Sequence, residues 1–182
     1  MDRIRLATVW LSGCAGCHMS FLDVDEYLIE IAGKIELVFS PFMDTKEKDF
    51  PTNVDVVLIE GAIAYDEQVH FIDKIRKNSK IVVSFGDCAI TGNVPSMRNP
   101  LGNPEVVLKH SYINNANENK QIPKYDDILP VLLEKVRPIH ELIKVDYFLP
   151  GCPPPGNRIK LVLSKLLAGE APILEGNDLK NG

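Results

Sequence analysis

The chain has 182 residues, of which 45% are hydrophobic and 25% are charged, and its formal net charge at pH 7 is −5. This mixture is typical of one ordinary globular domain with a full hydrophobic core. Acidic and basic residues are interspersed, and the lack of a basic stripe argues against a nucleic-acid partner. No apolar run approaches the roughly 20 residues of a membrane span, and the first residues are too polar and too few for a signal peptide. We therefore expect a cytoplasmic protein, or one on the inner side of a membrane complex, with no membrane span of its own.

Short apolar runs, several rich in β-branched residues, predict five strands. These runs cover residues 4–10, 35–39, 54–60, 80–85 and 145–149. Most of them are continuously apolar rather than alternating, which is typical of strands that are buried on both faces of a parallel sheet.

Helical periodicity separates most of these runs. Behind the first strand, Phe21, Val24, Leu28 and Ile31 are spaced 3, 4 and 3 residues apart, which predicts one amphipathic helix that ends near Gly33. A last helix carries one apolar stripe, formed by Ile159, Val162, Leu163, Leu166 and Leu167, and ends at Gly169. Three more helices are expected at Asp66–Lys77, at Pro104–His110 and from Asp126 or Asp127 to about Arg137, the last with Pro130 in its first turn.

The alternation of strands and helices predicts an α/β fold, specifically a flavodoxin-like doubly wound parallel sheet of about five strands. We expect one domain over residues 1–170 and a C-terminal tail over residues 171–182. Residues 86–124 look irregular, because they are rich in Asn, Pro and Gly. Long loops in compact domains are usually functional or disordered, so this segment is the expected site of partner contact.

Four cysteines occur in the sequence, and each follows the carboxyl end of a predicted strand. Cys14 and Cys17 form a C-x-x-C pair after the first strand, Cys88 follows the fourth, and Cys152 follows the fifth. Because the carboxyl ends of parallel strands share one edge, where ligands bind in such folds, the four thiols are expected to converge. In a reducing compartment, metal binding or redox chemistry explains them better than disulfide bonds do.

Four converging cysteines can hold either an iron–sulfur cluster or a structural zinc ion. Zinc modules usually use two close pairs, whereas here one pair is joined by two single cysteines on a fold that has its own core. Cys152-Pro153 also resembles ferredoxin ligand runs. We favour one 4Fe-4S cluster, with a zinc-stabilised scaffold as the alternative. Cysteines that are merely buried, or a thioredoxin-like pair at Cys14 and Cys17, would leave this shared placement unexplained.

The motifs "GCAGCHMSFLD", "EGAI", "SFGDCA" followed by Gly92, and "PGCPPP" together resemble the small subunit of nickel–iron hydrogenases, in particular the soluble, bidirectional NAD(P)-linked type. The resemblance runs from about Arg5 to Leu167. It implies that Cys14, Cys17, Cys88 and Cys152 bind one proximal 4Fe-4S cluster and that this chain contributes electron transfer but no catalytic residue. It also implies two kinds of partner, a large subunit with the Ni-Fe centre and diaphorase subunits with FMN and iron–sulfur clusters that reduce NAD(P).

Departures from related types narrow this assignment. Uptake hydrogenases carry an export signal and further clusters, whereas no cysteine follows Cys152 here, so we expect one cluster. The related complex I quinone-reductase subunit has adjacent cysteines in its first motif, whereas Ala15 and Gly16 separate Cys14 from Cys17. That subunit remains an alternative. FMN on this chain is unexpected, because the cysteine pair takes the loop in which a flavodoxin binds phosphate.

Several neighbours of the cysteines have open roles. Glu60, Asp87 and His18 lie beside the motifs and either face the cluster or serve as ordinary capping and packing residues. Arg98, in the long loop, either anchors that loop to the large subunit or is exposed. Six glycines bracket the cysteines and would allow close backbone approach, or simply form turns: Gly13, Gly16, Gly86, Gly92, Gly151 and Gly156.

Overall fold

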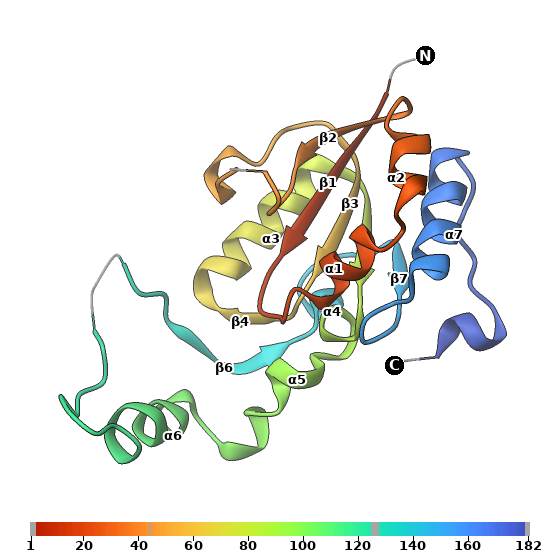
Figure 1. Cartoon of the computed structure of the whole chain (residues 1–182). Helices are drawn as coiled ribbons and strands as arrows, with labels where there is room; N and C mark the ends of the chain where they lie inside the picture. The colour runs from red at the N-terminus through yellow and green to blue at the C-terminus, as the bar shows by residue number, and fades with distance from the viewer. Residues whose placement is uncertain (1–2, 44, 125–127, 181–182) are drawn as a thin grey trace.

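The computed structural model describes residues 3–43, 45–124 and 128–180 and is built around a five-stranded parallel sheet (Figure 1). The strand order is β2-β1-β3-β5-β7, and every neighbouring pair is parallel. The strands are β1 (Ile4–Trp10), β2 (Ile35–Phe39), β3 (Val54–Glu60), β5 (Ser79–Phe85) and β7 (Tyr147–Leu149). Both the α/β class and the flavodoxin-like sheet of five strands are confirmed.

Helices cover both faces of this sheet. One layer holds α1 (Gly16–Leu22), α2 (Glu26–Ile31) and α7 (Gly156–Leu167), and the other is dominated by α3 (Asp66–Asn78) (Figure 1). Consecutive strand residues point to opposite faces. In β3, Val56 and Leu58 therefore join the first layer, whereas Val57 and Ile59 join the second. This double burial explains why the strands are continuously apolar in sequence.

The single helix expected after the first strand is wrong, because the segment forms two short helices. Asp25 adopts a positive φ of 49° between α1 and α2, which interrupts the helix. The buried face is nevertheless the expected one, since Phe21, Val24 and Ile31 all pack in the core. Near the break, Gly156 approaches so closely that a Cβ there would lie 3.3 Å from the Asp23 carbonyl oxygen. Packing against the start of α7 therefore accompanies the change of direction.

The helix expected to end near Arg137 is also wrong. Leu132–Arg137 forms β6, which pairs antiparallel with β4 (Ile63–Tyr65) in a separate two-stranded sheet. The Asn99 side chain fixes this strand from the side: it donates to the Val136 carbonyl at 2.9 Å and accepts the Val136 N–H at 2.8 Å. These hydrogen bonds to residues far away in the sequence override the helical pattern of the segment itself. The expected caps, Asp126 and Asp127, lie outside the described residues.

Residues 86–124 contain more regular structure than their composition indicates. They form α4 (Asp87–Thr91), α5 (Asn93–Ser96), α6 (Pro104–Lys109) and a π-helical turn at His110–Asn114. The short helix near Pro104 is confirmed. Figure 1 shows that α6 projects from the body together with the segments on either side of it, and we call residues 97–124 and 128–131 the arm. Within the described residues, none of the helices has the length and apolar character that a membrane crossing would require.

The end of the chain packs back onto the body. Leu174 is buried against the core layer that contains α7. The Arg158 side chain donates to the carbonyl oxygens of Asn177 and Lys180 at 3.0 and 3.1 Å. The residues beyond α7 therefore follow the surface of the domain as far as they are described.

The ion pair between Arg76 and Asp146 predicts a pH dependence of stability. Desolvation raises the pKa of Asp146, but the Arg76 and Val82 hydrogen bonds and the charges of Arg76 and Lys144 outweigh it, so the pKa is lowered. A carboxyl group with a lowered pKa stabilises the fold above its unfolded pKa of about 3.9, and this contribution is lost as pH falls through the folded value. In urea unfolding, Asp146→Asn should cost about 1–3 kcal/mol at pH 7 and much less near pH 3.

Asp73→Asn is the matched control for that experiment. Its pair with Lys77 is exposed, with 58% of the Asp73 side-chain surface accessible, and such pairs contribute little. An Asp146→Asn penalty that is the same at both pH values would contradict the interpretation.

The Asn99 contacts predict a local effect in β6. Asn99→Ala leaves the N–H and carbonyl of Val136 without their side-chain partner, which should cost about 1–3 kcal/mol. Hydrogen exchange at the Val136 amide should become faster. Asn115→Ala, which removes an exposed contact to His110, should leave that amide unchanged.

Candidate metal centre

The four cysteines lie on loops and helix starts at the carboxyl edge of the sheet. Cys14 lies between β1 and α1, Cys17 is in the first turn of α1, Cys88 is in α4 and Cys152 follows β7. Cys17 and Cys88 are buried, whereas Cys14 and Cys152 are exposed, and all four are free thiols. The predicted convergence at one edge is therefore present in the fold.

Backbone contacts join the loops that carry Cys88 and Cys152. The Asp87 N–H donates to the Gly151 carbonyl at 3.0 Å, and the Asp87 carboxylate accepts the Gly151 N–H at 2.7 Å. The Gly86 N–H also donates to the Leu149 carbonyl at 2.8 Å. Asp87 thus links two loops that are more than 60 residues apart in sequence, and Ser20 adds a hydrogen bond from α1 to the Pro154 carbonyl.

Glycines at this edge provide space for a cysteine and a tight turn. Gly86 has a φ of 84°, and a Cβ there would lie 2.2 Å from the Cys17 sulfur. Gly151 has a φ of 138°, and its Cβ would lie 2.5 Å from the Pro154 Cα. Only glycine meets both demands, because L side chains rarely adopt such a φ and any Cβ would collide with its neighbour. Gly92 meets the same two conditions, with a φ of 84° and a Cβ that would lie 2.8 Å from the Ser96 Cβ, so local geometry requires three of the six glycines singled out in the sequence.

Nitrogen donors already face two of the sulfur atoms. The Gly16 N–H donates to Cys14 Sγ at 3.4 Å, and the Asn93 side-chain amide donates to Cys152 Sγ at 3.4 Å. Hydrogen bonds to cysteine sulfur stabilise its thiolate form, the form that binds metals. The surroundings of these sulfurs thus fit a bound iron–sulfur group, whose potential such contacts tune.

The pKa shifts of the two buried cysteines, Cys17 and Cys88, show that other cysteines lie close to them. Burial raises the pKa of Cys17 most strongly, and the negative charge of Glu60 and the other three cysteines, led by Cys88, raise it further. The pKa of Cys88 is likewise raised, first by burial and then by Cys152. Burial and neighbouring negative charge make it costly to ionise these two thiols unless a cation lies beside them, and a bound metal group would supply that cation.

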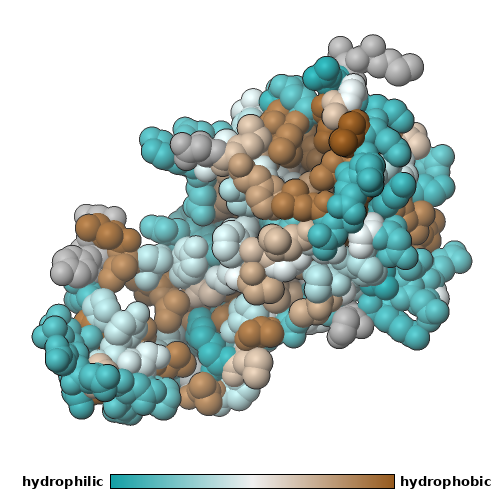
Figure 2. All heavy atoms as spheres, viewed as in Figure 1, coloured by the Kyte–Doolittle hydropathy of each residue, from teal (hydrophilic) through white to brown (hydrophobic). Residues whose placement is uncertain are grey.

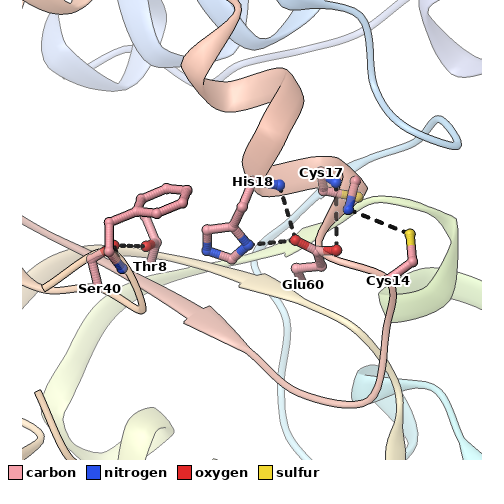
Figure 3. Close-up of polar contacts among 8 residues, drawn as sticks. Thr8, Cys14, Cys17, His18, Ser40 and Glu60 are labelled. Atoms are coloured by element: carbon pink, nitrogen blue, oxygen red, sulfur yellow. Dashed lines mark hydrogen bonds and ion pairs between the residues drawn. The ribbon is translucent and has the colours of Figure 1, made fainter. Parts of the chain in front are cut away.

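Glu60 and His18 form a buried pair beside this site (Figure 3). The Glu60 carboxylate contacts His18 Nδ1 and accepts the backbone N–H groups of His18 at 2.9 Å and Cys17 at 3.4 Å. Both residues are only 1% exposed. The open question of their roles is thus partly answered: they face the cysteine helix and not solvent.

The cysteines do not share a single-ion geometry. Within residues 3–43, 45–124 and 128–180, no three histidine, cysteine or carboxylate side chains are arranged to hold one metal ion. A 4Fe-4S cluster makes a different demand, because each of its four cysteines binds a separate iron. Tetrahedral zinc instead needs every ligand within about 2.3 Å of one point. The two metal groups thus make different demands on the positions of four cysteine sulfurs.

Arg98 lies outside the cysteine site. Its guanidinium donates to the carbonyls of Leu133 at 2.7 Å and of Ala64 and Glu134 at 3.3 Å, so it anchors the arm to β4 and β6 of its own chain. Asn93, by contrast, reaches Cys152 without having been singled out in the sequence. Its contact spans 59 residues, and nothing local in the sequence indicates it.

Comparisons with known proteins agree with the fold and the motifs. Residues 14–166 match the family described as "NADH ubiquinone oxidoreductase, 20 Kd subunit". A crystal structure of an NAD+-reducing NiFe hydrogenase in the H2-reduced state contains a chain that is 37% identical, with a TM-score of 0.92 and full coverage of both chains.

Two curated relatives are also hydrogenase subunits. The delta subunit of NAD-reducing hydrogenase HoxS from Cupriavidus necator is 38% identical, over 92% of this chain and 80% of its own length. A subunit of the F420-non-reducing hydrogenase from Methanothermobacter marburgensis is 40% identical, over 93% of this chain and 55% of its own length. The chain thus spans about half the length of that methanogen relative. The resemblance seen in the cysteine motifs is confirmed: the chain belongs to the NADH–ubiquinone oxidoreductase 20 kDa subunit family, and the proteins similar to it include subunits of NAD-reducing hydrogenases.

Proposed function

We propose that this chain is the electron-transfer small subunit of a cytoplasmic nickel–iron hydrogenase. In this proposal Cys14, Cys17, Cys88 and Cys152 bind one proximal 4Fe-4S cluster. The subunit connects the Ni-Fe centre of a separate large subunit with a flavin and iron–sulfur module that reduces NAD(P). The domain over residues 1–170 carries this role, and residues 171–182 follow it as a C-terminal segment.

The placement of the four cysteines at one edge of the sheet is the observation that carries the proposal. Cys14 and Cys17 form one pair, whereas Cys88 and Cys152 each come from a separate segment. The other three cysteines each contribute to the raised pKa of buried Cys17. When bound, a 4Fe-4S cluster supplies a one-electron carrier whose potential depends on nearby charges and hydrogen bonds. The chain supplies the sulfur ligands and the amide donors of Gly16 and Asn93, and it partly excludes water at Cys17 and Cys88.

Exposed apolar side chains near this edge support contact with a large subunit. Trp10 is 47% exposed and lies beside Gly13 in the cysteine loop, and Phe42 is 48% exposed and packs on His18. The arm also carries exposed apolar residues, including Met97 and Val131, and Figure 2 shows brown apolar surface between its polar residues. Large exposed apolar surfaces usually mark protein–protein contacts.

The names of the relatives support the wider assignment. The neighbour with a TM-score of 0.92 is part of an NAD+-reducing NiFe hydrogenase, and one archaeal relative is named an iron–sulfur subunit. We extend these properties to this chain as parts of the proposal, including partner subunits with FMN and iron–sulfur clusters. FMN is not proposed for this chain, because the cysteine pair takes the loop after β1. A cytoplasmic location is part of the proposal, because a reducing compartment keeps cysteine thiols available to bind a cluster.

A cluster on the four cysteines would give the purified complex a characteristic colour, iron content and EPR spectrum. The anaerobically purified complex should be brown, contain roughly four irons for this subunit's cluster, and give an EPR signal on reduction. Cys88→Ser should reduce this subunit's iron content and signal. A colourless, EPR-silent reduced sample of the chain with one zinc would overturn the cluster and favour the scaffold alternative. Co-purification with a quinone-reductase complex lacking a Ni-Fe subunit would favour the complex I-like alternative.

Gly86 makes room for the Cys17 sulfur, so an added methyl group there should disturb the cluster. In Gly86→Ala the new Cβ would lie 2.2 Å from the Cys17 sulfur, at a φ of 84° that alanine tolerates poorly. We expect loss of most of this cluster's iron and EPR signal in the purified complex.

Gly102→Ala is the control for backbone strain alone. Gly102 has a φ of 98°, but a Cβ there would have no atom within 4 Å. It should lower thermal stability while leaving the iron content near the wild-type value. Equal iron losses in both variants would show that strain, and not the sulfur contact, is responsible.

A further inference from the structure

The end of β3 is fastened to the cysteine loop by backbone contacts. The Leu11 N–H donates to the Glu60 carbonyl at 2.8 Å, and Ser12 and Ala62 exchange two hydrogen bonds at 3.1 and 2.8 Å. Gly61 has a φ of 92°, and a Cβ there would lie 2.8 Å from the Leu11 carbonyl carbon. The main chain of Glu60 is therefore held directly beneath the loop that leads to Cys14 and Cys17.

The Glu60 side chain continues this contact into α1. Its two carboxylate oxygens accept the N–H groups of Cys17 and His18 and contact His18 Nδ1 (Figure 3). These amides belong to the first turn of α1, where backbone N–H groups have no partner within the helix. The main-chain N–H of Cys17, a proposed cluster ligand, thus donates a hydrogen bond to a side chain that is 43 residues away in sequence.

His18 completes the pair from the other side. Its ring packs edge-on against Phe85 and Phe42, with centroid separations of 6.1 and 5.4 Å. Nε2 has no hydrogen-bond partner in the described structure, so Nδ1 is the ring nitrogen that makes the polar contact. A buried carboxylate is costly unless it is hydrogen-bonded, and here each of its partners belongs to the cysteine helix. The polar contacts of the Glu60 side chain therefore all go to the segment that carries Cys17.

We propose that Glu60 and His18 are positioning residues for the cluster, which fix the main chain at Cys17 and place a fixed negative charge beside the ligand set. This inference rests on the proposed function, because it requires a cluster on the four cysteines. A negative charge beside an iron–sulfur cluster disfavours the added electron and lowers the reduction potential.

The test is a redox titration of the purified hydrogenase complex, monitored by EPR, with variants of this chain. Glu60→Gln keeps the size of the side chain but removes its charge, so the midpoint potential of this cluster should shift to more positive values and its EPR line shape should change. His18→Asn retains a side-chain amide donor near the position of Nδ1, so it should shift the potential less. Glu36→Gln is the control, because Glu36 is exposed at the opposite end of the sheet, paired with Arg5, and should shift nothing.

A merely structural role would give a different pattern. Lower thermal stability of Glu60→Gln with a wild-type potential and line shape would overturn the proposal. If Glu60→Gln loses the cluster, Glu60→Asp and His18→Asn decide: unchanged potentials and line shapes in both would overturn it, and a changed line shape in either would support it. Absence of any iron–sulfur signal in the wild-type complex would instead refute the proposed function itself.

Discussion

All features of the candidate site depend on one constraint of parallel sheets, namely that the carboxyl ends of their strands meet at one edge. The order β2-β1-β3-β5-β7 places β1, β3, β5 and β7 side by side, so the segments after them become neighbours. Three of these segments carry the cysteines, and the end of β3 carries Glu60. Residues from four distant parts of the chain can therefore form one site.

Cross-element hydrogen bonds then turn this proximity into a defined arrangement. Asp87 links the segments after β5 and β7, Ser20 links α1 to the Cys152 loop, and Glu60 links β3 to α1. Each bond joins a side chain to a backbone group, so each fixes main chain near a cysteine. Side chains that bond to the main chain of a ligand loop control the ligand position more directly than side chains that only pack beside it.

The arm differs from the body in how it is stabilised. The body has two apolar layers on its sheet, whereas the arm is held by polar contacts of Arg98 and Asn99 to β6. Its apolar side chains, such as Met97 at 71% exposed, remain accessible. Few buried apolar contacts make a weak independent unit, which fits a segment that completes its burial against another subunit.

The sequence alone determined the class of fold, four of the five sheet strands nearly to the residue, and the convergence of the cysteines. These follow from patterns with a local cause: continuous apolar runs form buried strands, and strand ends collect ligands. The identity of the ligands stays a prediction, although the family that the motifs indicate is confirmed. Only the tertiary structure decided where a helix would be replaced by strand β6, where one helix would divide at Asp25, and which side chain reaches Cys152. Each of those outcomes depends on partners far away in the sequence, such as Asn99 for Val136 and Asn93 for Cys152, and local propensity carries no information about such partners.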